Sequence, residues 1–497
     1  LVQVKDKGVT NGSAIVFDNH TGEILAMVGS ADYFSRVRHG QVNGCLSLRQ
    51  PGSTMKPFTY ALALESGYTA ADIIPDIPLP GDESYQGYSP LNYDKTYHGP
   101  VRLREALACS YNVAAVNLVK KIGIRRLLNW LRNAGFSHLD KSASFYGPGL
   151  TLGAGEVTLL ELARAYSIFA RGGEWIPEKF IISACDTNGD EIELPEMPGA
   201  KNLLDPETAY IITDILGDQQ ARAPAFGQWC VLNFPFPCAA KTGTSKAFRD
   251  NWTVGYTTDY TVAVWVGNFD GKEMKRVSGI TGAGPLFREI MLALHKNAPP
   301  RDFPKPDGLV TIPVCPDSGE IPGKYCRNYI MEIFTTKNMP GKTCSVHRAI
   351  AIDSMTGQPP TPDTPAERLA EKVYRVFPPI YDEWMSKNGE EILSAKFKKT
   401  NHKTLQPGKP EICRPSHGSI YVRDPILRKE FQTIVLSAIS PGRPEHLAWY
   451  VDGKLYSQEN KDVVRWQLRP GRHVFEAEVS FPTGDKVRSS PVEILVL

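Results

Sequence analysis

The spacing of hydrophobic and polar positions divides residues 1–297 into strands at both ends with helices between them. Apolar runs at 13–18 and 23–28 flank a turn containing Gly22, which predicts a β-hairpin. Helical spacing follows at 53–64, at 101–121 with a polar break at 110–112, and at 158–169, where Thr158 and Glu161 predict a capping box. Strands are expected again at 238–244, 252–256 and 260–266, followed by an amphipathic helix at 284–295.

This order predicts a layered α/β (α+β) domain over residues 1–297, with its first and last strands side by side and helices on both faces of the sheet. Residues 298–410 are expected to form a Pro- and Cys-rich linker region with a helix at 365–387, interrupted by two prolines, and a basic loop at 396–403. Residues 411–497 show short alternating strands and a hairpin signal at Asp452-Gly453. They predict a small all-β, Ig-like sandwich.

The composition of the chain disfavours some classes of function. The chain has 497 residues, 42% of them hydrophobic, and a net charge of +2, which disfavours a role in coating nucleic acid or an anionic membrane. It contains no run of about 18 apolar residues of the kind that crosses a bilayer. The chain opens at Leu1 rather than at a methionine, so we expect a fragment or a processed product.

Three short motifs carry the candidate chemistry. Ser53 and Lys56 share one face of a helix, so that a lysine with a lowered pKa can activate the serine as a nucleophile. Ser110 and Asn112 form the polar break in the second helix, and residues 241–244 place a cation and two hydroxyls on an expected edge strand. Each motif alone is more often structural, but their order and their placement on a helix start, a helix break and a strand favour a common site.

Together the three motifs resemble the penicilloyl-serine transferase superfamily, whose signature is S-x-x-K, S-x-N and K-T-G. The flanking residues at 49–58, 104–113, 250–256 and 264–267 sharpen the resemblance to the transpeptidase domain of class A penicillin-binding proteins. Residues 315–319 and 344–347 and the Trp-containing end of the chain resemble the 1C type of these proteins. The resemblance implies a serine β-lactamase-like transpeptidase fold over about residues 10–297.

The resemblance also implies roles for individual residues. Ser53 would be the acylated nucleophile, Lys56 its general base, and Ser110 the residue that passes the proton to the leaving amine. Residues that would bind the donor peptide and its terminal carboxylate are Asn112, Lys241, Thr242, Gly243 and Thr244. The backbone N–H groups of Ser53 and Thr244 would form the oxyanion hole. No cofactor or metal is expected in this chemistry.

The implied reaction is peptidoglycan D,D-transpeptidation, with stem peptides ending in D-Ala-D-Ala as donors and covalent inhibition by β-lactams. A D,D-carboxypeptidase and a β-lactamase are the nearest enzymatic rivals. A penicillin-binding scaffold or sensor with little cross-linking activity is the alternative from another class. The resemblance further implies a parent protein with a glycosyltransferase domain and a single-pass anchor, facing the periplasm from the inner membrane.

Nine cysteines suggest an oxidising compartment. We expect a disulfide between Cys230 and Cys238, whereas Cys45 and Cys109 are expected to be unpaired and to act as small hydrophobic residues. Cys315, Cys326, Cys344 and His347 have spacings unlike those of zinc fingers, so pairing among these cysteines is favoured and a zinc site is the alternative. In the C-terminal sandwich, we expect Trp449, Trp466 and Tyr450 to pack in the core or hairpin, and a protein or glycan is the candidate partner.

Overall fold

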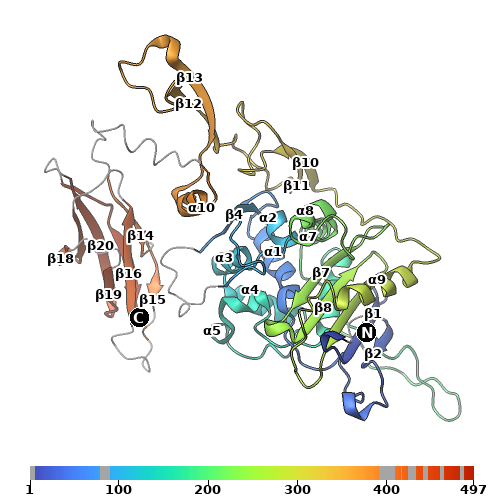
Figure 1. Cartoon of the computed structure of the whole chain (residues 1–497). Helices are drawn as coiled ribbons and strands as arrows, with labels where there is room; N and C mark the ends of the chain where they lie inside the picture. Colours follow the sequence, from blue (N-terminus) through green and yellow to red (C-terminus); the bar gives the residue numbers. More distant parts are fainter. Residues whose placement is uncertain are drawn as a thin grey trace. The chain divides into compact units, whose positions relative to one another are not determined.

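The computed structural model describes residues 6–78, 90–390, 409–415, 417–421, 423, 432–439, 446–458, 464–481 and 486–497. The chain divides into two compact units (Figure 1). The first comprises Leu1–Gly357 and Pro365–Leu393, and the second comprises Gln358–Thr364 and Ser394–Leu497.

The centre of the first unit is an antiparallel sheet of five strands. Their spatial order is β2 (Ile24–Val28), β1 (Asn11–Asp18), β9 (Tyr260–Gly267), β8 (Asp250–Tyr256) and β7 (Ala239–Thr244). Strand β1 pairs with β9 along its whole length, from Asn11 opposite Gly267 to Asp18 opposite Tyr260. The expectation that the first and last strands lie together is thus confirmed, and β7 forms one edge of the sheet.

Each face of this sheet is buried against helices because its strands are apolar on both sides. Val262, Val264 and Val266 pack beneath α9 (Ala283–Leu294), whereas the alternating Ala263 and Trp265 face the core that contains α6 (Leu159–Ala170). Figure 1 shows α9 lying across the strands. Helix α6 begins with the predicted capping box of Thr158 and Glu161.

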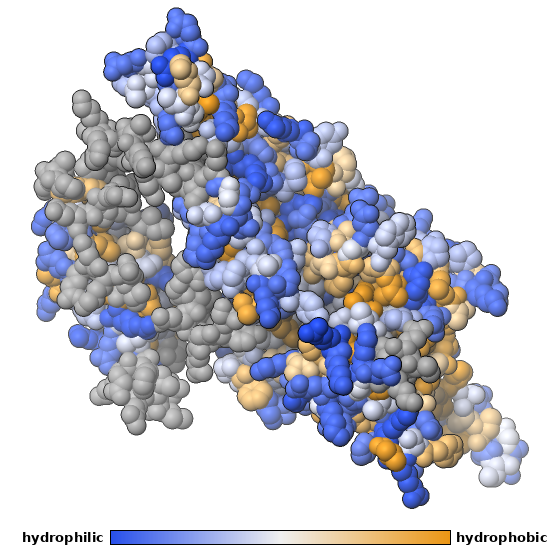
Figure 2. Space-filling model, in the orientation of Figure 1, coloured by the Kyte–Doolittle hydropathy of each residue, from blue (hydrophilic) through white to orange (hydrophobic). Residues whose placement is uncertain are grey.

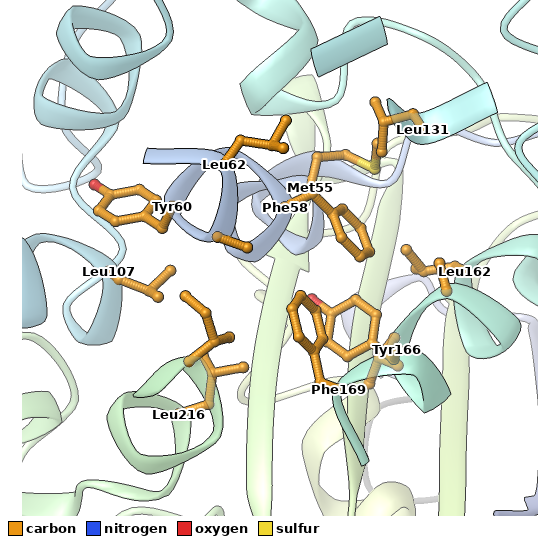
Figure 3. Close-up of a cluster of buried hydrophobic side chains, with 14 of the residues drawn as sticks. Met55, Phe58, Tyr60, Leu62, Leu107, Leu131, Leu162, Tyr166, Phe169 and Leu216 are labelled. Atoms are coloured by element: carbon orange, nitrogen blue, oxygen red, sulfur yellow. The ribbon is translucent and has the colours of Figure 1, made fainter. Parts of the chain in front are cut away.

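The larger core surrounds α1 (Lys56–Leu64). Phe58 is fully buried and stacks on Phe169 at 5.6 Å, while Tyr166 meets its edge at 5.5 Å. Figure 3 shows these rings between α1 and α6. The other elements of this domain are η2 (Arg36–Arg38), η3 (Gly52–Met55), β3 (Ile73–Asp76), β4 (Gly99–Arg102), α2 (Leu103–Ala108), α3 (Asn112–Ile122), α4 (Ile124–Asn133), α5 (Ala143–Tyr146), η5 (Gly147–Leu152), β5 (Glu174–Trp175), β6 (Lys201–Asn202), α7 (Pro206–Gly217), α8 (Gln219–Phe226) and η6 (Lys246–Phe248).

Residues 298–390 form two further strand pairs rather than the expected long helix. Strand β10 (Leu309–Val314) pairs with β11 (Ile330–Thr335), and β12 (His347–Asp353) pairs with β13 (Leu369–Arg375). The helix predicted at 365–387 is wrong over its first part, because β12 provides a full partner for residues 369–375 in an uninterrupted register. Only η7 (Ala366–Arg368), η8 (Pro379–Tyr381) and α10 (Asp382–Lys387) are helical there. The basic loop at 396–403 lies outside the described residues.

The second unit contains the predicted β structure. One sheet has the order β14 (Glu411–Arg414), β16 (Thr433–Ile439), β19 (Val464–Gln467). The other has the order β15 (Ile420–Tyr421), β22 (Val492–Val496), β20 (Gly471–Ser480), β17 (His446–Val451), β18 (Lys454–Ser457), with β21 (Lys486–Arg488) beside β20. Trp449 and Trp466 are almost fully buried, as expected of core residues. Asp452 and Gly453 both have positive φ, at 52° and 75°, which suits the tight turn between β17 and β18.

In the part of the chain that the structure describes, none of the helices combines the length and the apolar character that a bilayer crossing requires. Figure 2 shows that hydrophilic and hydrophobic side chains are mixed over the visible face of the first unit.

Candidate active site

Ser53 lies in the short turn η3 immediately before α1 and lines a cavity of about 590 Å³. Lys56 is the first residue of α1 and is fully buried. The serine is therefore half-buried at the cavity wall while the lysine lies beneath it. Other motif residues at the wall are Ser110, Asn112, Thr242 and Thr244.

The turn of Ser53 lies unusually close to strand β7. Gly52 has φ +60°, and a Cβ at this position would be 2.6 Å from the carbonyl oxygen of Thr244. A Cβ on Gly243 would be 2.2 Å from the carbonyl oxygen of Pro51. The two glycines thus allow the first and third motifs to be in backbone contact, which a side chain at either position would prevent.

The second motif projects into the same place. Ser110 occupies the break between α2 and α3 with φ 62°, a left-handed conformation that costs a non-glycine residue energy and is often found at functional sites. The Nζ of Lys56 lies 2.5 Å from the carbonyl oxygen of Ser110, 3.2 Å from its Oγ and 2.8 Å from Asn112 Oδ1. Lys56 therefore connects α1 to the helix break.

Lys241 brings the third motif to the same hydroxyl. Its Nζ donates to Ser110 Oγ at 2.8 Å and to the carbonyl oxygen of Thr242 at 3.0 Å. Thr244 Oγ1 accepts from the backbone N–H of Gly279 at 2.9 Å, which orients this side chain at the cavity. Lys56 and Lys241, which are 54 and 131 positions from Ser110 in the chain, thus meet at one oxygen atom, as the motif order suggested.

Both lysines are in surroundings that disfavour their charged forms. Burial lowers the pKa of Lys56 well below its usual 10.5, and the nearby charge of Lys241 lowers it further. Burial, with a smaller effect of the positive charge of Arg222, lowers the pKa of Lys241 to about 7. A neutral amine is therefore accessible near neutral pH at Lys56.

No sequence pattern marked the residues that hold the second motif in place. Asn92 Oδ1 accepts the backbone N–H groups of Asn112 at 2.7 Å and Val113 at 3.2 Å. Asn92 Nδ2 donates to the fully buried Asp76 at 2.6 Å, and Asp76 also accepts from the backbone of Ala114 at 3.0 Å. This network caps the start of α3, but it comes from a loop and a short strand without a recognisable motif.

A family model described as the penicillin-binding protein transpeptidase domain matches residues 12–292. The chain belongs to the penicillin-binding serine transpeptidase family. Two further models match its later parts: the penicillin-binding protein 1A C-terminal domain at residues 305–349, and the penicillin-binding protein C-terminus family at residues 399–477.

Individual penicillin-binding proteins are similar over the same region. Penicillin-binding protein 1A of Aquifex aeolicus is 34% identical over 68% of this chain and 45% of its own length. That of Neisseria meningitidis is 32% identical over 63% of this chain and 40% of its own length. The chain thus spans less than half of these relatives.

Solved structures agree in fold. Penicillin-binding protein 1A from Haemophilus influenzae has a TM-score of 0.57 at 24% identity and covers 67% of this chain and 54% of that protein. PonA1 from Mycobacterium tuberculosis in complex with penicillin V has a TM-score of 0.51 at 23% identity, over 59% of this chain and 80% of that protein. The expected penicillin-binding transpeptidase fold is confirmed.

The expected disulfide between Cys230 and Cys238 is wrong. All nine cysteines are free, which confirms the prediction that Cys45 and Cys109 are unpaired; both of these thiols are buried. Leu232 and Phe234, between the two cysteines, are buried in the core beneath α9. Apolar packing therefore holds this loop against the sheet, and the Cys230 sulfur accepts the backbone N–H of Leu232 at 3.4 Å.

Proposed function

We propose that this chain is a peptidoglycan D,D-transpeptidase that works through an acyl-enzyme on Ser53. The observation that carries the proposal is the convergence of Lys56 and Lys241 on Ser110 Oγ, beside the cavity that Ser53 lines. A serine needs a neighbouring base to react at neutral pH, and the buried amine of Lys56 is that base.

The contacts of Lys56 can be made by a neutral amine as well as by a charged one. A neutral amine carries two hydrogens and one lone pair. Two carbonyl-type acceptors, the Ser110 backbone oxygen at 2.5 Å and Asn112 Oδ1 at 2.8 Å, take the two hydrogens. Ser110 Oγ, at 3.2 Å, is the third oxygen at Nζ: it accepts the third hydrogen of a charged Lys56. When the amine is neutral, its lone pair can take the hydroxyl proton of Ser53 or Ser110, which is the requirement for general-base catalysis.

Ser110 is assigned to proton transfer and Asn112 to the donor peptide. Ser110 Oγ lies between the two amines, so it can receive a proton from one side and deliver it to the departing amine. Asn112 lines the cavity and its Nδ2 is held by the carbonyl oxygen of Leu91 at 2.8 Å. Its amide thus has a fixed orientation towards an entering peptide.

Strand β7 provides the wall for the peptide. It lies at the edge of the sheet, and an extended substrate can align with such an edge. Lys241 and Thr244 are assigned to the terminal carboxylate, and Thr242 to the wall that binds the peptide. Gly243 allows the close contact with the serine turn. The backbone N–H groups of Ser53 and Thr244 would form the oxyanion hole, in which one donor contributes about 3–4 kcal/mol.

In the first step, Ser53 Oγ attacks the carbonyl carbon of the penultimate D-alanine while its proton passes to Lys56. The peptide bond to the terminal D-alanine breaks, and that amine leaves with the proton delivered through Ser110. In the second step, an amine of a neighbouring stem attacks the ester, forms the cross-link and returns Ser53 to the hydroxyl form. A β-lactam enters the first step and remains attached as an acyl-enzyme.

The test is mass spectrometry of the intact chain after exposure to penicillin. We expect one adduct in the parent chain and none in Ser53→Ala. Ser144→Ala, at an exposed serine of α5, is the matched control and should keep the adduct. Persistence of the adduct in Ser53→Ala would refute the assignment of the nucleophile.

Cross-linking is tested separately, with polymeric or lipid-linked peptidoglycan and chromatography of the products. Cross-linked stem dimers support transpeptidation. Shortened stems without dimers would indicate a carboxypeptidase, rapid turnover of penicillin would indicate a β-lactamase, and acylation without either product would indicate a scaffold or sensor.

The proposal extends to the setting of the enzyme. We propose that the chain is of the 1C type and that it lies at the periplasmic face of the inner membrane. We further propose that residues 411–497 bind a protein or glycan partner. A chain lacking residues 411–497 should still bind labelled penicillin but bind such a partner less tightly, which a pull-down from cell-envelope extract would measure.

A further inference from the structure

A second cluster of reactive side chains lies in the first unit, outside the serine site. Cys315, Cys326, Cys344 and His347 place their Sγ and ring nitrogen atoms within 4.8 Å of one another. His347 Nδ1 lies 3.4 Å from Cys315 Sγ, 3.5 Å from Cys326 Sγ and 3.4 Å from Cys344 Sγ. The three sulfurs thus surround one nitrogen at nearly equal distances.

These distances suit a shared tetrahedral ion. With Zn–S bonds of about 2.3 Å and a Zn–N bond of about 2.05 Å, a tetrahedron places sulfur and nitrogen about 3.6 Å apart. A disulfide would instead bring two sulfurs to about 2.05 Å and leave the third cysteine and the histidine without a role. All three thiols are free, so the pairing favoured by the sequence spacing is wrong.

The far side of the imidazole is also arranged as in a metal site. His347 Nε2 lies 3.2 Å from Asp317 Oδ2, and Arg375 Nη1 lies 3.8 Å from the other carboxylate oxygen. Metal-binding histidines almost always donate their second N–H to a carboxylate, a carbonyl or water, which fixes the tautomer. The Cys326 sulfur accepts the backbone N–H of Gly323 at 3.3 Å, a contact that stabilises a thiolate.

We propose that Cys315, Cys326, Cys344 and His347 bind one structural zinc ion. Three thiolates and a neutral imidazole give the site a net charge of −1 with Zn²⁺, and binding releases the three thiol protons to solvent. All four tetrahedral positions are taken by protein atoms, so the ion has no open position for a substrate. This site is independent of the serine chemistry and does not rest on the proposed function.

The position of the cluster defines what the ion would hold together. Cys315 follows β10, Cys326 precedes β11, and His347 is the first residue of β12. The ion would therefore join the two strand pairs. The β10–β11 loop and the β11–β12 loop also meet at a parallel bridge between Ile321 and Thr343. Loops of this kind, rich in Gly and Pro and poor in apolar residues, gain most from a metal cross-link.

The loop also contacts the transpeptidase domain. Gly319, with φ +71°, lies so close to Ala71 that a Cβ would be 2.2 Å from its carbonyl oxygen. Ala71, Val314 and Phe334 form a small buried cluster at the same boundary. The ion would therefore fix a loop that is packed directly against the catalytic domain.

The experiment is elemental analysis by inductively coupled plasma mass spectrometry, on the whole chain purified without chelators or metal-affinity resin and then dialysed. We expect about one zinc per chain in the parent protein and almost no zinc in Cys344→Ser. Cys185→Ser, at an exposed cysteine outside the cluster, is the matched control and should keep full occupancy. Labelled penicillin binding, measured in parallel, shows whether each variant still folds.

A second variant keeps all four ligands. Asp317→Asn should lower zinc affinity by about 10- to 100-fold, measured by competition with a chromogenic chelator, because it weakens the partner of His347. Replacement of zinc by cobalt should give the visible absorption of a tetrahedral thiolate site. A chain that folds but binds no zinc on titration, holds iron in its place, or carries a disulfide among these cysteines would overturn the proposal.

Discussion

Glu332 on β11 provides a direct test of how the strand pair β10–β11 supports the second motif. Its carboxylate is buried and receives Arg104 Nε at 2.8 Å and Arg104 Nη2 at 2.5 Å. Arg104 lies on α2, which ends just before Ser110. We expect Glu332→Gln to destabilise the first unit and to slow acylation, because it leaves the arginine without its main counter-charge.

The magnitude follows from the burial of the pair. Removing one partner of a buried ion pair costs about 3–5 kcal/mol, since the other charge is left in a poorly solvated place. Asp214 and Asp218 remain at 2.7 and 3.1 Å from Arg104 and are partly exposed, so we expect the lower end of this range. A loss of about 3 kcal/mol is roughly a hundredfold change in the folding equilibrium.

The assay is urea unfolding followed by the loss of labelled penicillin binding, which reports the first unit. Glu371→Gln, at an exposed glutamate of β13, is the control and should change stability by less than about 0.5 kcal/mol. Arg104→Met with Glu332→Met removes both charges and should recover at least about 1 kcal/mol relative to Glu332→Gln. A loss below about 1 kcal/mol in Glu332→Gln, or a double variant that is no more stable than Glu332→Gln, would refute this reasoning.

Three more predictions concern the site and its core. Gly52→Ala should abolish penicillin acylation while leaving much of the fold, because its Cβ would be 2.6 Å from the carbonyl oxygen of Thr244; normal acylation kinetics would contradict the close approach. The acylation rate should have a bell-shaped pH profile: it falls at low pH as Lys56 is protonated, and it falls as pH rises through about 7, where Lys241 of the free protein loses its charge. Stopped-flow rates that climb continuously into the alkaline range would exclude these roles. Phe58→Ala should cost about 3–5 kcal/mol in urea unfolding, since it empties the centre of an aromatic cluster; a loss under about 1 kcal/mol would show that the cluster collapses around the gap.

The central sheet and the helices beside it were predictable because each has a clear period. Val262, Val264 and Val266 alternate with residues of the opposite face, and Thr158 with Glu161 marks a helix start within four residues. The convergence of the three motifs was predictable as well, because the chemistry that their resemblance implies requires particular side chains in a particular order. The structure brings them together at the cavity, as their order along the chain suggested.

The parts that sequence reasoning missed depend on partners distant in the chain. Residues 369–375 carry a helix-like pattern but form a strand because β12 lies beside them. Asp76 and Asn92 have no local signature, and their role at α3 appears only when the loop folds over the helix start. The spacing of the three cysteines is irregular because two separate loops, rather than one finger, bring the sulfurs together: Cys315 and Cys326 lie between β10 and β11, and Cys344 lies between β11 and β12.

The shared hydroxyl of Ser110 has a consequence for testing the proposed mechanism by mutagenesis. Lys56 and Lys241 both form hydrogen bonds to Ser110 Oγ, at 3.2 and 2.8 Å, so the two amines share this hydroxyl. In the proposed mechanism, loss of any one of these three residues interrupts the same proton route. The losses of transition-state stabilisation in the three single replacements are therefore not additive, and their sum exceeds the loss in the triple replacement. The loss measured for one replacement is thus not the separate contribution of that residue.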